Sequence, residues 1–104
     1  QDAFELREID RLVAVGQSQP QTVFEIMGRK GELDPTQLLL RTHYAEGLAA
    51  YRAQQWDGAR SAFARALEAV AGDGPSKTFI ERIAALRQNP PPADWDGAWH
   101  LESK

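Results

Sequence analysis

The sequence predicts a small α+β domain, mostly α, on three observations. Its first 28 residues are rich in β-branched and aromatic types around a turn, and the next segment repeats apolar residues at three- and four-residue spacing. Three consecutive prolines then end the helical pattern before a tail that contains two tryptophans. We therefore expect a β-hairpin in residues 1–28, a linker in residues 29–35, a three-helix domain in residues 36–89, and a docked Pro/Trp-rich tail in residues 90–104.

The hairpin is predicted by two strand-like runs, residues 8–15 and residues 21–27, with turn-forming residues between them. In the second run Thr22, Phe24 and Ile26 share one face, and both faces are partly apolar. An isolated two-stranded hairpin is marginal in water. We therefore expect these strands to belong to a larger sheet, or to self-associate when they are separated from it.

A first helix is predicted to begin at Asp34 and Pro35. The Asp34 side chain can accept hydrogen bonds from unpaired amides, and proline suits the first helical position because its missing N–H costs nothing there. Apolar residues then recur at helical spacing to about Ala53, where we expect the helix to end.

A second helix is expected to be capped by Asp57 and to extend to Val70, with an apolar stripe along one side. Because the connection to the first helix is short, the two helices should pack antiparallel. A third helix is expected to open at Pro75 and to stop before Pro90, since consecutive prolines cannot continue a helix.

Composition narrows the classes of function. The 104 residues carry a formal charge of −3 with scattered Lys and Arg, which argues against nucleic acid as a partner. The absence of cysteine excludes disulfides and thiolate catalysis. No apolar stretch approaches the length that spans a bilayer, and we expect a cytoplasmic location, with any membrane anchor of a parent protein lying upstream. Because the chain begins with Gln1, we expect it to be a piece of a longer protein.

The first two predicted helices carry a packing signature that resembles one tetratricopeptide repeat. Six positions agree in register: Gly47, Tyr51, Trp56, Ala59, Phe63 and Ala66. The match covers residues 41–70 and departs from the pattern at Ala50, where a large aromatic is usual, and at Gln54, which replaces the turn glycine. One repeat cannot bury its own apolar face, so other parts of the chain or another chain must cover it. The alternative is an ordinary helical hairpin with these spacings by chance.

The segment FELREIDRLVAVGQSQPQTVFEIM, residues 4–27, resembles the final two strands of class III adenylate and guanylate cyclase catalytic domains. The positions that match are Asp10, Val13, Gly16, Ser18, Pro20, Val23, Phe24 and Glu25. The remainder is similar to the tetratricopeptide-like extension that follows such domains in many bacterial cyclases. Its further marks are Gly74, Pro75 and Ser76 at a turn, and Pro91, Pro92, Asp94, Trp95, Asp96 and Gly97 near the end.

The resemblance implies a non-catalytic C-terminal interaction or regulatory module of a cyclase whose parent converts ATP to cyclic AMP. In the family the metal-binding carboxylates and the transition-state asparagine and arginine lie upstream, so no activity and no cofactor are expected in this segment, and Mg or Mn would belong to the parent. The phosphate-contacting lysine of the family falls on Gln17, whose neutral amide cannot supply that charge. The implied partners are the upstream catalytic domain and an unidentified protein or peptide.

The alternative function is a free-standing tetratricopeptide-like scaffold that binds peptides or proteins through the concave face of its helices. Other candidate chemistry is sparse. His43 and His100 are far apart and have no companion at metal-ligand spacing, so no metal site is expected. A small enzyme ranks third and last among the hypotheses. The sequence shows no group of residues that could serve as nucleophile, general base or metal ligands.

Overall fold

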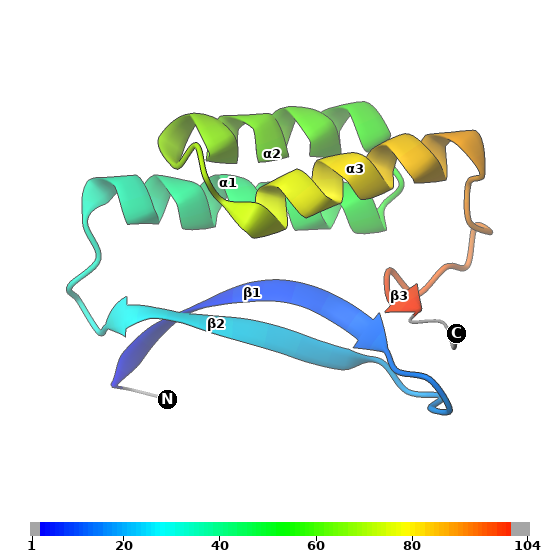
Figure 1. Cartoon of the computed structure of the whole chain (residues 1–104), viewed down its shortest axis with the longest axis horizontal. Coiled ribbons are helices and arrows are strands. Elements are labelled where there is room, and N and C mark those ends of the chain that lie inside the picture. The colour runs from blue at the N-terminus through cyan, green and yellow to red at the C-terminus, as the bar shows by residue number, and fades with distance from the viewer. Residues whose placement is uncertain (1–2, 101–104) are drawn as a thin grey trace.

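The computed structural model describes residues 3–100, which form one sheet and one helical layer. The elements follow the order β1 (Phe4–Val13), β2 (Gln21–Arg29), α1 (Pro35–Arg52), α2 (Trp56–Ala69), α3 (Gly74–Gln88) and β3 (Trp99–His100). The hairpin lies along one side of the helices, and α2 is the helix farthest from it (Figure 1). The predicted fold class, α+β and mostly α, is confirmed.

The sheet has the order β2-β1-β3, so β1 is its central strand. β1 is antiparallel to β2 and parallel to β3, which pairs with the last two residues of β1. Both long strands differ in extent from the predicted runs, because β1 begins at Phe4 and ends at Val13, and β2 continues to Arg29. The tail docks partly by adding β3 to the sheet, a strand that the sequence analysis does not predict.

Two bulges interrupt the β1–β2 ladder, one at Ile9 and one at Met27, neither of which has a cross-strand partner. Helix α1 supplies the hydrogen bonds that these positions lose. The Tyr44 hydroxyl donates to the Ile9 carbonyl at 2.7 Å, and Gln37 Nε2 donates to the Met27 carbonyl at 3.4 Å. The bulges therefore position β1 and β2 against α1 as well as bending them.

Helix α1 begins with the capping interaction that the sequence predicts. The Asp34 carboxylate accepts from the Gln37 backbone N–H at 2.8 Å, and the Gln37 side chain accepts from the Asp34 N–H at 3.1 Å. The prediction that Asp57 caps α2 is wrong. The N-cap of α2 is Gln55, which makes no side-chain capping bond, and Asp57 lies within the first turn, where its charge suits the helix dipole.

Helix α3 begins at Gly74, one residue before the predicted start, because Asp73 is its N-cap. The Asp73 carboxylate accepts from the Ser76 backbone N–H at 3.2 Å and from the Ser76 hydroxyl at 2.7 Å. The helix ends at Gln88, before the proline run as predicted.

The core lies between the helices and is largely aromatic. The Tyr51 and Phe79 rings meet edge to face with centroids 4.7 Å apart, and Phe63 stacks on Phe79 at 5.0 Å. Trp95 of the tail joins this cluster, with its ring centroid 5.2 Å from that of Tyr51. The tail thus covers a part of the core that two helices alone would leave exposed, as the sequence analysis expects.

Candidate interaction site

The residues of the helix-packing signature meet where α1 packs on α2. Gly47 lies directly against Phe63, and a Cβ on Gly47 would stand 2.7 Å from two carbons of that ring. Tyr51 contacts Trp56 edge to face with centroids 5.7 Å apart, while the remaining members, Ala59 and Ala66, are fully buried. This group therefore belongs to the helical core.

Gln54, the residue at the position of the turn glycine, adopts a φ of 61° in the connection between α1 and α2. That left-handed conformation is one that glycine adopts without strain. The Gln54 side chain donates to the Pro92 carbonyl at 2.8 Å. At this position glutamine adopts a strained backbone conformation, and its side-chain hydrogen bond to Pro92 helps to hold the tail against the helices.

Gln17, the position of the family's phosphate-contacting lysine, lies in the exposed turn at the tip of the hairpin (Figure 1). Its backbone N–H donates to the Ala14 carbonyl at 3.0 Å, and Gly16 beside it has a φ of 81°. The two histidines lie apart from it and from each other, His43 beside Glu46 on α1 at 3.0 Å and His100 on β3. Within residues 3–100 no three His, Cys, Asp or Glu side chains are grouped so as to hold a metal ion.

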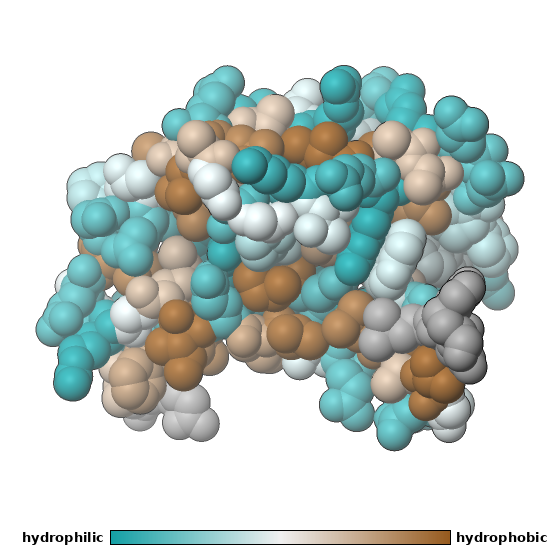
Figure 2. Space-filling view, in the orientation of Figure 1, coloured by the Kyte–Doolittle hydropathy of each residue, from teal (hydrophilic) through white to brown (hydrophobic). Residues whose placement is uncertain are grey.

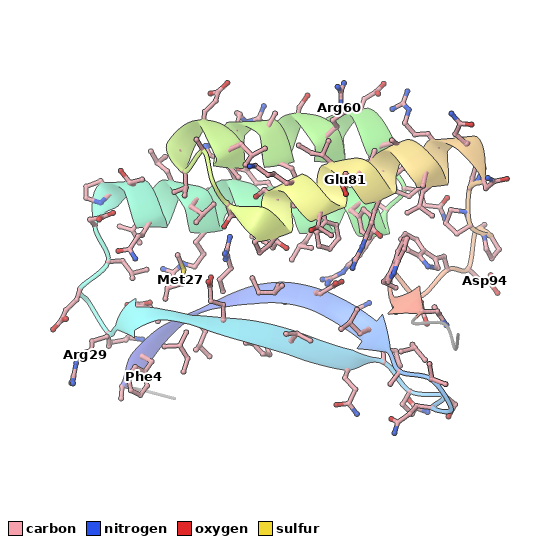
Figure 3. All side chains as sticks on the ribbon, in the orientation of Figure 1. Phe4, Met27, Arg29, Arg60, Glu81 and Asp94 are labelled. Carbon is pink, nitrogen blue, oxygen red and sulfur yellow. The ribbon has the colours of Figure 1, made fainter. Side chains whose placement is uncertain are left out.

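A layer of ion pairs joins β1 to the helices. Figure 3 shows the long side chains that fill the space between the hairpin and α1 and α3. We call these four contacts the ion-pair layer: Glu5 with Arg41 at 2.9 Å, Arg7 with Asp73 at 3.0 Å, Glu8 with Arg52 at 2.8 Å, and Asp10 with Arg82 at 2.9 Å. Two of the helical partners belong to α1, and the other two stand at the N-cap and within α3. Each of these helices therefore holds β1 at two points.

Arg7 is the most buried member of the ion-pair layer, with only 3% of its surface exposed. Its Nη1 and Nη2 donate to the two carboxylate oxygens of Asp73, each at 3.0 Å, and its Nε donates to Glu25 at 2.9 Å. The guanidinium also lies 4.7 Å from the centre of the Tyr44 ring. Burial by itself would lower the pKa of Arg7, but the bonds to Asp73 and Glu25 outweigh it and raise that pKa.

The carboxylate of Asp73 is held ionised by the same contacts. Burial by itself would raise its pKa, but the hydrogen bonds from Arg7 and Ser76, together with the charge of Arg7, hold the pKa of Asp73 below its usual value. Burial also raises the pKa of the Tyr44 phenol, so this hydroxyl remains a hydrogen-bond donor to β1. The Arg7–Asp73 pair is therefore charged near neutral pH.

The ion-pair layer is not predicted from the sequence. A sequence signal for it is nevertheless present, because five of the ten residues of β1 are charged and both signs occur: Glu5, Arg7, Glu8, Asp10 and Arg11. A strand that carries so many charges can be buried only if partners neutralise them. The identity of those partners depends on which distant helices cover the strand, and local pattern does not contain that information.

Strand β2 contrasts with β1, because every residue from 21 to 26 is exposed. Glu25 reaches inward to Arg7, so its neighbours Phe24 and Ile26 point to the opposite face, and they are 56% and 64% exposed. Figure 2 shows apolar side chains along the hairpin in addition to those between the helices, and Phe4 in Figure 3 points away from the helices. The hairpin therefore presents an apolar outer face.

The two edges of the hairpin are protected differently. On the free side of β1, Arg41 Nη1 approaches the Leu6 carbonyl at 3.4 Å, and β3 pairs with Leu12 and Val13. β2 is the outer strand of the sheet, so its second edge faces no other strand of the described chain. Phe24 and Ile26 belong to both surfaces, because their side chains lie on the outer face and their backbone forms part of the open edge.

A cleft of ≈ 300 Å³ separates β1 from α1. Its lining combines the apolar side chains of Leu6, Ala45, Leu48 and Ala49 with the charged side chains of Arg41 and Arg52. Both arginines are already paired with carboxylates of β1. The cleft could therefore accept an apolar side chain more readily than a charged one.

Comparisons of this chain with models of protein families, with curated proteins and with solved structures find no match. None of the helices described within residues 3–100 combines the length and the apolar character needed to cross a membrane. The fold and site define a small α+β domain whose strand β2 has an exposed apolar outer face and an open edge.

Proposed function

We propose that this chain is a non-catalytic interaction module at the C-terminal end of a class III adenylate or guanylate cyclase whose parent converts ATP to cyclic AMP. The observation that carries the proposal is the asymmetry of the hairpin. β1 is tied to the helices by the ion-pair layer, while residues 21–26 of β2 remain exposed with an apolar outer face. The resemblance of residues 4–27 to the last two strands of cyclase domains supplies the partner, an upstream catalytic domain.

In this proposal the hairpin completes the parent's catalytic sheet, its outer face packs on the catalytic domain, and the helices make the regulatory contact. The ion-pair layer gives the coupling a physical route, because α1 and α3 each hold β1 at two points. A partner that displaces either helix must move β1 or break buried ion pairs. Binding of a partner to the helices would thereby change the position of the hairpin in the catalytic domain.

The proposal assigns no catalytic step to this chain. Its one position that corresponds to a phosphate contact, Gln17, is neutral and lies in an exposed turn. Mg or Mn would be bound by carboxylates of the parent, and we propose a cytoplasmic location for the module. The nucleotide would be bound and converted entirely by upstream residues, with this chain acting on the position of the last two strands.

The experiment uses the complete natural polypeptide. Cyclic AMP formation from ATP with Mn²⁺ is measured for the unchanged protein, for Ile26→Glu on the outer face, and for Arg87→Ala on the exposed side of α3 as the control. We expect Ile26→Glu to reduce activity strongly and Arg87→Ala to preserve it. The isolated chain should form no cyclic AMP. Activity of the isolated chain, or an upstream sequence without cyclase motifs, would overturn the proposal.

The second candidate, a free-standing peptide-binding scaffold, is favoured by the cleft beside α1. Replacing Ala49 with Arg would fill this cleft without touching the outer face of β2. If an extended apolar peptide binds the unchanged chain and not Ala49→Arg, while the upstream sequence lacks cyclase motifs, the scaffold function replaces the cyclase function. Fluorescence anisotropy of a labelled peptide gives the required measurement.

A further inference from the structure

We propose that β2 pairs with β2 of a second copy of this chain, antiparallel and centred on Phe24, so that two hairpins form one continuous sheet. This inference goes beyond the proposed cyclase attachment, because it concerns the strand edge and leaves the outer face of the combined sheet open. It applies to this chain when it is separated from any parent sheet.

The edge of β2 is open over a defined stretch. Within the described part of the chain, the backbone of residues 21–26 is hydrogen-bonded only in the ladder with β1. The same six residues are exposed, so the helices leave them uncovered. A row of unpaired backbone donors and acceptors beside apolar side chains is a template for another strand.

Of the devices that block a strand edge, this stretch carries one, the inward-pointing charge of Glu25, which pairs with Arg7 at 2.7 Å. Lysine, proline and bulges also protect natural edge strands. Residues 21–26 contain none of these three, because Pro20 precedes them and the bulge at Met27 follows them. The other edge of the hairpin is covered by Arg41 and by β3. The open length matches the five or six residues of an average strand.

The side chains favour one self-pairing register. With Phe24 opposite its own copy, Thr22 faces Ile26, and Val23 faces Glu25. The outer face then gains an aromatic pair flanked by two β-branched pairs, which are the favourable cross-strand combinations. Phe24 and Ile26, the two most exposed apolar side chains of β2, are both matched.

Neighbouring registers are worse. A register centred on Glu25 places the two Glu25 carboxylates directly opposite each other, and like charges in that position are destabilising. A register centred on Val23 places Ile26 opposite Pro20, which has no N–H to donate. In the register centred on Phe24, the two Glu25 side chains are only diagonal neighbours, and each forms an ion pair with Arg7 of its own copy at 2.7 Å.

Sedimentation equilibrium over a micromolar concentration series tests whether the pairing occurs. We expect the unchanged chain to pass from monomer to dimer, and Phe24→Lys to remain monomeric. The matched control is Leu39→Lys, which removes an apolar side chain of similar exposure from α1 and should dimerise like the unchanged chain. A monomeric unchanged chain, higher assemblies in place of a dimer, or a Phe24→Lys variant that dimerises equally well would overturn the proposal.

Disulfide trapping tests the register, because the chain contains no cysteine of its own. Directly opposite residues of antiparallel strands have Cα atoms about 4.5–5.5 Å apart, within the range a disulfide spans. Phe24→Cys should therefore form a cross-linked dimer under mild oxidation. Val23→Cys and Glu25→Cys place their thiols on diagonal neighbours about 7–8 Å apart and should cross-link poorly. Faster cross-linking of either variant than of Phe24→Cys would overturn the register.

Discussion

Arg7 and Asp73 form a two-point hydrogen-bonded ion pair between the first strand and the start of the third helix, across 66 residues of sequence. Both nitrogen–oxygen distances are 3.0 Å, and the two residues are only 3% and 8% exposed. Because Asp73 also caps α3 through Ser76, one carboxylate fixes both the beginning of that helix and the position of β1. The hairpin is therefore attached to the helices by specific polar contacts in addition to apolar burial.

The substitution Asp73→Ala should be strongly destabilising. It leaves the Arg7 guanidinium buried without its main partner, and removing one member of a buried pair costs about 3–5 kcal/mol of unfolding free energy. Urea unfolding followed by circular dichroism measures the loss. The matched control is Arg87→Ala, which breaks the exposed pair with Asp57 and should change the midpoint little. Equal effects of the two substitutions would show that the buried pair contributes no special stability.

Acid should destabilise the chain through the same carboxylate. The pKa of Asp73 is lower in the folded state than the ordinary value of 3.8, so its stabilising contribution is complete above about pH 4 and is lost as pH falls through the folded pKa. Glu5 acts in the same direction, because the Gly31 backbone N–H and Arg41 lower its pKa. The urea midpoint should therefore be nearly flat from about pH 7 to 5 and fall below about pH 4.

The control for the acid experiment is Asp73→Asn, which cannot titrate at this position. Its midpoint should start lower than that of the unchanged chain at neutral pH, and it should fall less steeply below about pH 4. Parallel curves for the two proteins would mean that protonation of Asp73 is not linked to folding.

Gly47→Ala should be destabilising by about 1–3 kcal/mol, the usual cost of overpacking a core. The added Cβ would stand 2.7 Å from the Phe63 ring, which is fully buried and stacked on Phe79, so it cannot move away without disturbing the core. Gly58→Ala is the control. Its Cβ would meet only Ala50 at 3.9 Å, and replacing a helical glycine should stabilise α2 by about 0.5–1 kcal/mol. Thermal melts of both variants should therefore shift in opposite directions.

Gly97→Ala should release the tail. Its φ of 77° is unfavourable for alanine, and the added Cβ would lie 2.7 Å from Arg52 Cγ. Gly31→Ala is the control, since its φ of 80° is similar but nothing lies within 4 Å of the new Cβ. Tryptophan emission should shift to the red in Gly97→Ala, as Trp95 leaves the cluster around Tyr51, and should be unchanged in Gly31→Ala. A buried-type spectrum in both variants would contradict this role of Gly97.

Local features of the sequence predict most of the elements correctly. The helical spacing of apolar residues and the Asp34 cap place α1 within one residue of its observed end, and the proline run ends α3 as expected. The close approach at Gly47 is also foreseen, because small and aromatic residues at fixed helical spacing determine which helix faces meet. Asp57 is misplaced as a cap because aspartate is equally suited to the first turn of a helix.

The candidate site is much harder to predict from the sequence than the helices are. The hairpin and the partly apolar faces of its second strand are predicted, and both strands are expected to belong to a larger sheet. The structure distinguishes them, since β1 is covered by α1 and α3 and residues 21–26 of β2 are not. That difference depends on two bulges and on hydrogen bonds from Tyr44 and Gln37, which form only when α1 lies across the hairpin.

The sequence by itself determined the fold class, the helices and the docking of a tryptophan-bearing tail, because caps, periodicity and proline act over a few neighbouring residues. Only the tertiary structure decided that Arg7 pairs with Asp73, that β3 completes the end of the sheet, and that the edge of β2 stays open. Those features arise from contacts between segments far apart in the chain. Their energies depend on burial and on the exact distance between charges, neither of which exists until the hairpin and the helices have packed together.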